Sequence, residues 1–387
     1  MMPGMTTFPM LHWHDGTTTR SARWRSGNDL PPPARVCKAD DNMTADAAFR
    51  LASEGTALLW QGDFHNARQL LQAMARRVDA GPRRARRAAA LPADALQRFN
   101  AHRQAQSQRA RTLGMLLIPI TADYTIPLRR APDVQLACEQ AWGLADGTDA
   151  VVSLRELQGL IGAFEWRRKG VPVPALHASI HPHYGVFAPV RGEYVELVAN
   201  APLPPTTLAF DIGTGTGVLA AVLATRGVAQ VVATDLDARA VACAQDNLHR
   251  LGLDGRVSVV SVDLFPPGRA DLVVCNPPWL PARPSSALER AVYDPDSRML
   301  RGFLSGLTEH LRPDGEGWLI LSDLAEHLGL RRRAELLDLI ASCHLKVVGR
   351  IDIRPSHPRV SDHADALHAA RAAEVTSLWR LKISGPP

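Results

Sequence analysis

Three glycines at alternate positions follow an apolar run that ends in an acid, and they form the sharpest chemical signal in the chain. Residues 208–220 read Leu-Ala-Phe-Asp-Ile-Gly-Thr-Gly-Thr-Gly-Val-Leu-Ala. Glycine lets a backbone turn sharply between a strand and a helix and lets it approach a ligand closely. This segment is therefore predicted to hold a cofactor, and its candidate binding residues are Asp211, Gly213, Thr214, Gly215 and Gly217.

The spacing of the glycines restricts the class of cofactor. A dinucleotide loop needs a glycine three residues after Gly215, but Val218 stands there, and no Gly-Lys-Ser/Thr of a P-loop follows. A carboxylate at Asp211 would repel a pyrophosphate, whereas it would attract a ligand with a cationic amino-acid end. The residues thus favour a ribose-bearing, positively charged cofactor, and a nicotinamide oxidoreductase remains the rival interpretation.

Three hydrogen-bond acceptors stand directly after the next apolar runs of the chain: Asp235, Asp263 and Asn276. Open α/β sheets bind their ligands at the carboxyl ends of the strands, so we expect these side chains to converge on one site. A carboxylate such as Asp235 can accept two hydrogen bonds from vicinal ribose hydroxyls. Asp263 by itself would also be explained as a helix cap or a turn residue.

The glycine segment and these strand ends resemble motif I and the following elements of the class I S-adenosylmethionine-dependent methyltransferases, over about residues 180–385. The resemblance implies that Asp235 binds the ribose, that Asp263 binds the adenine amino group, and that Leu264 or Phe265 flanks the ring. Leu236, which directly follows Asp235, is also predicted to bind the cofactor. S-adenosyl-L-methionine is therefore the expected cofactor.

Residues 276–279 read Asn-Pro-Pro-Trp, which resembles the (N/D)-P-P-(Y/F/W) motif of methyltransferases that modify nitrogen in a planar, conjugated group. Such a nitrogen is a poor nucleophile because its lone pair is delocalised. Hydrogen bonds from its NH₂ group to the Asn276 side chain and the Pro277 carbonyl would free that lone pair. Trp279 would stack on the planar group. The prediction is direct methyl transfer without a covalent enzyme intermediate, with Asn276, Pro277 and Trp279 as catalytic residues.

The substrate class is left with two alternatives. Residues 184–191 and 288–302 are similar to segments of release-factor glutamine methyltransferases, which favours the side-chain amide of a protein glutamine. An exocyclic amine of adenine or guanine in RNA or DNA is favoured by Trp279 as a stacking platform and by a basic stretch that contains Arg83, Arg84, Arg86 and Arg87. That stretch would equally be a solvated helix face. A third hypothesis is a non-catalytic cofactor- or RNA-binding module.

Apolar runs alternate with helical stretches in the second half of the chain, which is typical of β-α-β units. We predict an α/β fold with a Rossmann-like, seven-stranded methyltransferase sheet that is mostly parallel and has an antiparallel last strand. The predicted strands are residues 208–212, 231–235, 257–262, 272–275, 318–321, 345–353 and 375–383. The predicted helices are residues 218–225, 238–251, 296–310 and 332–342.

The length of 387 residues exceeds the usual single-domain size, so the sequence predicts more than one folded unit. The predicted division is a disordered leader over residues 1–43, a mainly helical accessory domain over 44–170 that selects a macromolecular substrate, and the methyltransferase domain over 171–387.

The composition excludes several classes of protein. No apolar run approaches the ~18 residues of a membrane helix, so no membrane association is expected. The 5 cysteines are scattered without a Cys-x-x-Cys pair, which fits a reducing cytoplasm. His177, His181 and His183 have no carboxylate or thiol partner at ligand spacing, so no metal site is predicted. The formal net charge is +5.

Overall fold

The structure of the chain is a computed structural model that describes residues 8–88, 94–284, 288–355 and 365–385, without the side chains of residues 82–88 and 288. The chain divides into two compact units. The first consists of Met1–Ala93 and Asn100–Phe164, and the second of Asp94–Phe99 and Glu165–Pro387. Among the described helices, none combines the length and the apolar character that crossing a bilayer requires.

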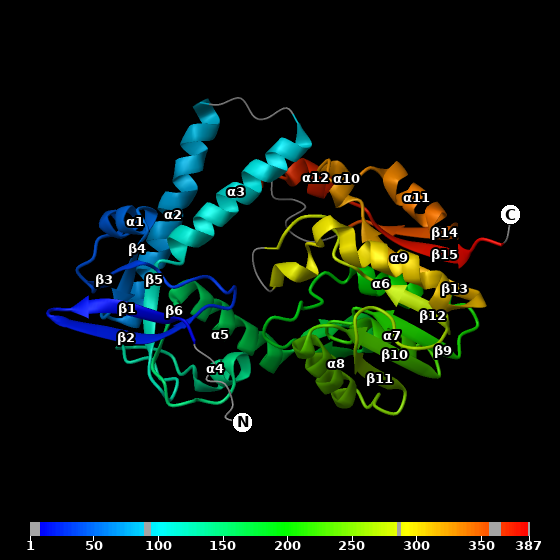
Figure 1. Cartoon of the computed structure of the whole chain (residues 1–387), viewed down its shortest axis with the longest axis horizontal. Coiled ribbons are helices and arrows are strands. Elements are labelled where there is room, and N and C mark those ends of the chain that lie inside the picture. Colours follow the sequence, from blue (N-terminus) through cyan, green and yellow to red (C-terminus); the bar gives the residue numbers. More distant parts are fainter. Residues whose placement is uncertain (1–7, 89–93, 285–287, 356–364, 386–387) are drawn as a thin grey trace, which may run out of the picture. The chain divides into compact units, whose positions relative to one another are not determined.

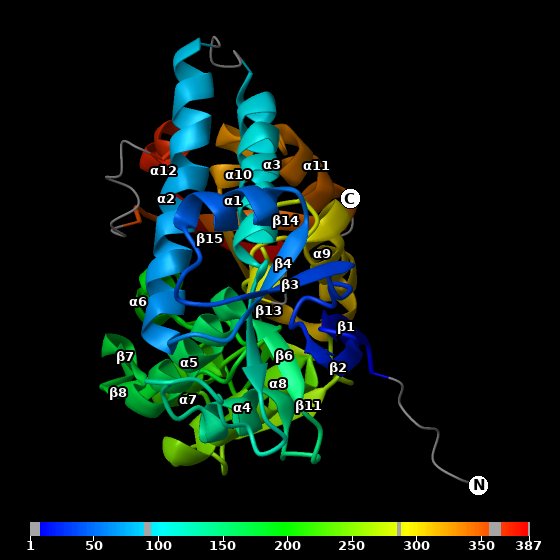
Figure 2. The ribbon, with the colours of Figure 1, turned by 90° about the vertical axis from the view of Figure 1, so that its left-hand side faces the viewer.

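The first unit is built around a six-stranded mixed sheet with the order β1-β2-β6-β5-β4-β3. Figure 2 shows part of this sheet beside helices α1 and α2. The strands are β1 (Met10–Asp15), β2 (Thr18–Arg25), β3 (Arg35–Ala39), β4 (Thr56–Trp60), β5 (Leu116–Ile120) and β6 (Ala150–Ser153). The helices are α1 (Ala45–Ser53), α2 (Phe64–Ala88), α3 (Ala95–Leu113), α4 (Gln135–Trp142) and α5 (Leu154–Lys169). The beginning of α3, up to Phe99, and the end of α5, from Glu165, belong to the second unit.

The prediction of a disordered leader over residues 1–43 is wrong, because β1, β2 and β3 lie within it. Leu11 of β1 and Trp24 of β2 are buried in one cluster with Leu59, Leu117 and Val151 of the central strands. Each leader strand turns only a few apolar side chains inward, so the run of residues 10–39 looks polar in the sequence. Burial against the distant strands is what orders it.

The prediction of a mainly helical accessory domain over residues 44–170 also needs correction, because the unit is a mixed α/β fold. Strand β4 lies between α1 and α2, inside the stretch predicted to be mainly helical. Its residues Ala57, Leu58, Leu59 and Trp60 are all buried. A strand buried on both faces is a continuous apolar run, which periodicity alone does not distinguish from part of a buried helix.

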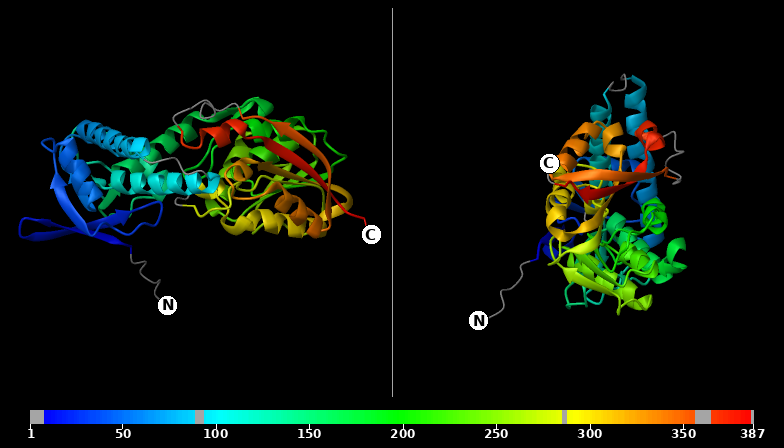
Figure 3. Two further views of the ribbon diagram at one scale, coloured as in Figure 1. Left: turned by 90° about the horizontal axis from the view of Figure 1, so that it is seen from above. Right: turned by 90° about the vertical axis from the view of Figure 1, so that its right-hand side faces the viewer.

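The second unit contains a seven-stranded sheet with the order β11-β10-β9-β12-β13-β15-β14, which confirms the predicted strand content. The strands are β9 (Leu208–Ile212), β10 (Gln230–Asp235), β11 (Val257–Ser261), β12 (Ala270–Cys275), β13 (Leu311–Ser322), β14 (Leu345–Ile353) and β15 (Thr376–Ile383). β9 to β13 pair in parallel, and β15 is antiparallel to both β13 and β14. Figure 3 shows β14 and β15 side by side at the end of the chain.

Helices cover both faces of this sheet (Figure 1). On one face α6 (Glu193–Asn200), α7 (Val218–Thr225) and α8 (Ala238–Arg250) pack with Ala209 of β9 in a single core cluster. On the other face α9 (Arg298–His310) and α11 (Arg333–Ser342) pack with Phe210. Successive strand residues point to opposite faces, so every central strand contributes to both cores and reads as an unbroken apolar run.

Shorter elements connect these layers. They are the β-hairpin of β7 (Val171–Val173) and β8 (Ala178–Ile180), helices α10 (Leu324–His327) and α12 (His368–Ala373), and three 3₁₀ turns at Pro174–Leu176, Leu288–Ala291 and Pro295–Ser297.

A small apolar cluster of the second unit, which we call the Phe99 cluster, includes Phe99 from the beginning of α3. Phe99 is 3% exposed and packs with Leu280, Leu324, Ala325, Leu328 and Leu367. Leu280 directly follows the Asn-Pro-Pro-Trp segment of residues 276–279. A residue far away in the sequence therefore supports the loop that carries the predicted catalytic side chains.

Candidate active site

The acceptors predicted to converge stand at neighbouring strand ends. β9 lies between β10 and β12, with Ile212 opposite Thr234 on one side and Cys275 on the other. Asp235 is the last residue of β10, and Asn276 follows the last residue of β12. Adjacent strands are about 4.8 Å apart, so the backbones at Gly213, Asp235 and Asn276 meet at one edge of the sheet.

Asp211 organises the glycine loop from within. Its side chain is 1% exposed, and its Oδ2 accepts hydrogen bonds from Thr214 Oγ1 at 2.6 Å and from the Ala220 backbone N–H at 3.0 Å. Burial raises the pKa of this carboxyl to about 6. The acid therefore ties the loop to the first turn of α7, and its charge is close to neutralisation at mildly acidic pH.

The three glycines of the loop all have left-handed backbone conformations, with φ of 71° at Gly213, 56° at Gly215 and 82° at Gly217. A Cβ on Gly213 would meet the flexible end of Met299, and one on Gly215 would meet nothing within 4 Å. A Cβ on Gly217 would lie 3.2 Å from both the Cα and the Cβ of Ala244. Gly217 is thus the position where α7 begins in close contact with α8.

Gly217→Ala is expected to lower the free energy of unfolding by about 2–4 kcal/mol, because it combines left-handed strain with a contact against helix backbone. Gly215→Ala is the matched control, since it carries only the conformational cost of about 1–2 kcal/mol. Urea denaturation of the two variants measures the difference. Equal losses would show that the approach of α8 does not constrain this glycine.

Asp235 connects the ends of β9 and β10. Its Oδ2 accepts a hydrogen bond from the Gly215 N–H at 3.0 Å, and its Oδ1 accepts one from the Asp237 N–H at 3.0 Å. Burial raises the pKa of this carboxyl as well. Each oxygen still has a lone pair, so the side chain keeps acceptor capacity for a pair of hydroxyls. The neighbouring Leu236 is 64% exposed.

The three residues that follow β11 and were considered for adenine binding have different surroundings. Asp263 forms an ion pair with Arg298 at the start of α9, with 2.5 Å between Oδ2 and Nη2, and its side chain is 44% exposed. Leu264 has a left-handed φ of 65° and packs against the core on the α9 side. The ring of Phe265 stacks on that of His310, with the ring centroids 4.3 Å apart.

The Asn-Pro-Pro-Trp segment begins where β12 ends. Asn276 Oδ1 accepts a hydrogen bond from Trp279 Nε1 at 2.9 Å, and Pro277 is buried. Trp279 is partly buried against the core on the α9 side. The Arg191 guanidinium lies 5.4 Å from the centroid of the Trp279 ring. The aromatic side chain is therefore packed within the protein in addition to lying at the predicted site.

The loop that follows the segment is also anchored. The Leu280 N–H donates to the Val292 carbonyl at 3.0 Å, and the Asp294 N–H donates to the Leu280 carbonyl at 2.8 Å. The Asp294 side chain in turn accepts hydrogen bonds from the N–H groups of Met299 and Leu300 in the first turn of α9. The Asn-Pro-Pro-Trp segment and the start of α9 are thus connected by hydrogen bonds through Leu280 and Asp294.

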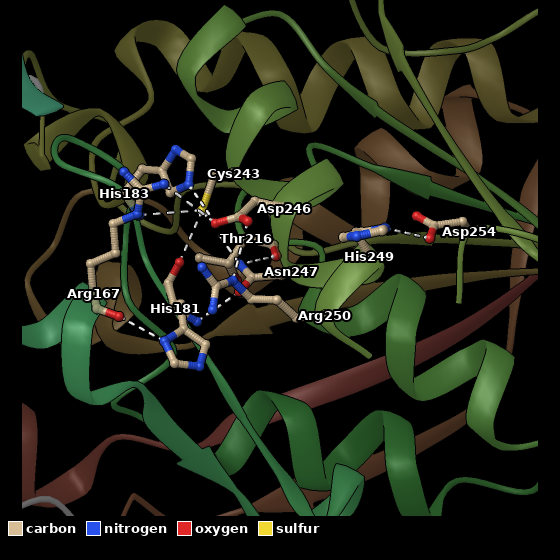
Figure 4. Close-up of polar contacts among 10 residues, drawn as sticks. All are labelled: Arg167, His181, His183, Thr216, Cys243, Asp246, Asn247, His249, Arg250 and Asp254. Atoms are coloured by element: carbon tan, nitrogen blue, oxygen red, sulfur yellow. Dashed lines mark hydrogen bonds and ion pairs between the residues drawn. The ribbon is translucent and has the colours of Figure 1, made fainter. Parts of the chain in front are cut away.

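Sequence reasoning missed Asn247, a buried side chain of α8 that supports the glycine loop (Figure 4). Its Nδ2 donates to the Thr216 carbonyl at 3.0 Å, and its Oδ1 accepts from the His181 N–H at 2.7 Å. The loop is thereby fixed to the segment that precedes α6. An asparagine in a helix gives no signal for this role, because both partners are backbone groups from distant segments.

The histidines considered as metal ligands take part in the contacts that Figure 4 shows around α8. His181 Nδ1 lies 2.6 Å from the Arg167 carbonyl oxygen, and His183 Nε2 lies 3.1 Å from Asp246 Oδ2. Burial lowers the pKa of His183, although Asp246 opposes this effect. Asp246 also pairs with Arg167 and Arg250. These contacts fasten residues 181–183 to α8.

Comparison with known protein families gives a match between residues 180–332 and the model of the methyltransferase small domain. The chain is similar to the release factor glutamine methyltransferase of Cereibacter sphaeroides, with 33% identity over 171 residues, which are 38% of this chain and 62% of that protein. It is also similar to the ribosomal RNA small subunit methyltransferase C of Alcanivorax borkumensis, with 35% identity over 28% of this chain and 30% of that protein.

Among solved structures, a methyltransferase from Pyrococcus furiosus is 16% identical and covers 57% of this chain and 97% of its own, with a TM-score of 0.40. A further relative is the tRNA1(Val) (adenine(37)-N6)-methyltransferase of Shewanella loihica, whose match includes 43% of this chain. Because this relative is 30% identical over a match that covers 70% of its length, the chain belongs to the class I S-adenosylmethionine-dependent methyltransferases.

Proposed function

We propose that the chain transfers the methyl group of S-adenosylmethionine to a planar NH₂ group of a macromolecule, with the side-chain amide of a protein glutamine as the first candidate. The observation that carries this proposal is the position of Asn276. It follows β12, the strand beside β9, so its amide stands next to the glycine loop that would hold the methyl donor. In this proposal, the methyl donor and the side chain that binds the amine lie at the same strand ends.

The residues of the loop fit this cofactor. The carboxylate of Asp235 retains acceptor capacity for the ribose hydroxyls, and the positive-φ glycines leave the backbone uncovered for close approach. Asp263 would contact the adenine amino group only together with, or in place of, its ion pair to Arg298. When bound, the cofactor supplies a methyl group already activated by a sulfonium, so no strong base is needed.

The chain's own contribution is to orient the acceptor. The oxygen of Asn276 and the carbonyl of Pro277 would each accept a hydrogen bond from the NH₂ group, which draws the nitrogen toward a pyramidal geometry. The freed lone pair would then be able to accept the methyl group of the cofactor, which would leave as a neutral thioether. The methylated nitrogen loses one proton to water.

Glutamine is preferred over a nucleobase because two arginines of the basic stretch are already paired with carboxylates. Arg77 bonds Asp46 at 2.6 Å, and Arg109 bonds Asp79 at 2.8 Å, which reduces the positive charge offered to a polyanion. The relative from Cereibacter sphaeroides is named for glutamine methylation. The candidate contacts Arg83, Arg84, Arg86 and Arg87 have side chains outside the described residues.

An exocyclic amine of adenine in RNA is the second candidate, because the relative from Shewanella loihica is named for methylation of adenine N6 in a tRNA. Adenine and glutamine both present an NH₂ group on a conjugated carbon. The Asn276 and Pro277 acceptors would accommodate either group, so the acceptor chemistry does not separate the two.

The deciding experiment is to incubate the purified chain with tritiated S-adenosylmethionine and an extract of cells that lack its gene. Protease-sensitive label supports the glutamine proposal, and nuclease-sensitive label supports the nucleobase. Asn276→Ala serves as the control for background methylation in the extract. Cofactor binding without label in protein, RNA or DNA would instead support a non-catalytic binding module, and binding of NAD without S-adenosylmethionine would support an oxidoreductase.

Cofactor affinity is expected to depend on pH. Burial raises the pKa of Asp211 to about 6, so this acid gains negative charge as the pH increases through this range. Burial raises the pKa of Asp235 as well. The sulfonium and ammonium groups of the cofactor favour the ionised forms. The dissociation constant should therefore fall between about pH 5 and pH 7 and level off above.

Isothermal titration calorimetry at several pH values measures this dependence, and adenosine is the matched control because it has the same ribose and base without the cationic end. Its affinity should change much less over the same range. Equal pH dependence of the two ligands would show that the acids do not respond to the charge of the cofactor.

A further inference from the structure

The hydrogen bond between Trp279 and Asn276 determines which way the asparagine amide faces. An indole N–H can only donate, so the atom of Asn276 that lies 2.9 Å from Trp279 Nε1 must be the oxygen. An amide has two orientations that exchange its oxygen and nitrogen, and only one of them satisfies the indole. The contact therefore selects one orientation of the side chain predicted to hold the acceptor amine.

The indole is itself held in place. Trp279 is partly buried and packs against the core on the α9 side, and the guanidinium of Arg191 lies 5.4 Å from its ring centroid. Arg191 Nη2 forms an ion pair with Glu374 Oε1 at 3.2 Å, and the Glu374 side chain is only 1% exposed. An ion pair to a buried carboxylate, two residues before β15 (Thr376–Ile383), thus restrains the arginine near the ring.

The buried carboxylate of Glu374 is fixed in turn. Its Oε1 accepts a hydrogen bond from Ser322 Oγ at 2.7 Å, at the end of β13. The same Ser322 Oγ accepts a hydrogen bond from the Leu324 N–H at 3.0 Å. A continuous set of contacts therefore leads from the end of the central sheet to the Asn276 amide, and each member is oriented by the next.

We propose that Trp279 acts as a positioning residue, which fixes the oxygen of Asn276 toward the acceptor amine through its indole N–H. This inference rests on the proposed function. The Asn276 oxygen has two lone pairs, so one accepts from Trp279 while the other accepts from the substrate. The role differs from stacking on the substrate, because it depends on one N–H group and not on the area of the ring.

The sharpest test replaces Trp279 by β-(3-benzothienyl)alanine, which keeps the size and shape of the indole and exchanges only its N–H for sulfur. The kcat of methyl transfer should fall about fivefold to tenfold, which corresponds to the loss of one hydrogen bond, while KM and the cofactor Kd stay within about twofold. Trp166→Phe is the matched control, because Trp166 is 45% exposed. A substrate-stacking role predicts nearly unchanged kcat for the benzothienyl variant.

A double-mutant cycle separates positioning from packing. With alanine at position 276, the benzothienyl replacement at position 279 should cause no further loss of kcat, because the partner of the N–H is already absent. Independent losses that add would overturn the proposal, since they would show that the indole acts on something other than Asn276.

Nuclear magnetic resonance tests the hydrogen bond without any substrate. In a chain with ¹⁵N-labelled tryptophan, the indole signal that disappears in Trp279→Phe belongs to Trp279. In Asn276→Ala, that signal should shift upfield and its proton should exchange with water faster. An unchanged signal would overturn the inference. If the wild-type chain labels no macromolecule, the proposed function fails, and this measurement still decides whether the amide is fixed.

Discussion

Replacing Asn276 by alanine is expected to lower the kcat of methyl transfer by about 100-fold or more, while the cofactor Kd changes by less than about threefold. The variant removes the side-chain acceptor that would hold the NH₂ group of the substrate, and the loss of one positioned group at a reacting atom has effects of this size. Single-turnover transfer of tritium, combined with calorimetric titration of the cofactor, measures both quantities.

Pro277→Ala is the matched variant for Asn276→Ala, because it keeps a backbone carbonyl at the same position and removes only the restriction on the backbone. It should lose much less activity. A parallel loss of cofactor binding and turnover in Asn276→Ala would contradict the assignment, because it would place the amide in cofactor binding and not in orientation of the acceptor.

Asp235→Ala is expected to weaken S-adenosylmethionine binding by about 10- to 100-fold, as follows from the value of hydrogen bonds to a charged acceptor. Two losses combine in this variant. The ribose hydroxyls lose their acceptor, and the Gly215 N–H loses the oxygen that now fixes it at 3.0 Å. Calorimetric titration of the folded variant gives the change in Kd.

Asp237→Ala is the control for this prediction. Asp237 caps α8 by accepting a hydrogen bond from the Arg239 N–H at 2.9 Å, and it stands two residues from the proposed ribose acceptor. Its replacement should cost about 1 kcal/mol of stability without a comparable loss of affinity. Wild-type affinity in Asp235→Ala would show that this carboxylate does not bind the ribose.

The sheet of the second unit was predictable because its central strands are apolar runs and because a helix separates most of its strands from the next one in the chain. The pattern reflects burial on both faces, which needs no knowledge of the partner strands. The first strands of the first unit could not be predicted in this way. Its strands β1 and β2 acquire their order from contacts with Leu59 and Leu117, far along the chain, and a short polar-looking strand does not reveal such partners.

In the candidate site, the positions of the residues could likewise be predicted, whereas their contacts could not. The positions of Asp211, Asp235 and Asn276 follow from strand ends, so they could be predicted to meet at one edge. The partners of those residues could not. Arg298 beside Asp263 and Arg191 above Trp279 come from segments whose placement depends on the packing of α9 and of the region before α6.

The Phe99 cluster means that the catalytic half of the chain is not a detachable module. A truncated protein that begins at Glu165 would lack Phe99 and would leave Leu280, Leu324 and Leu328 without the aromatic ring that covers them. The bared apolar surface would lie one residue beyond Trp279, so such a fragment should aggregate more readily and turn over more slowly than the whole chain.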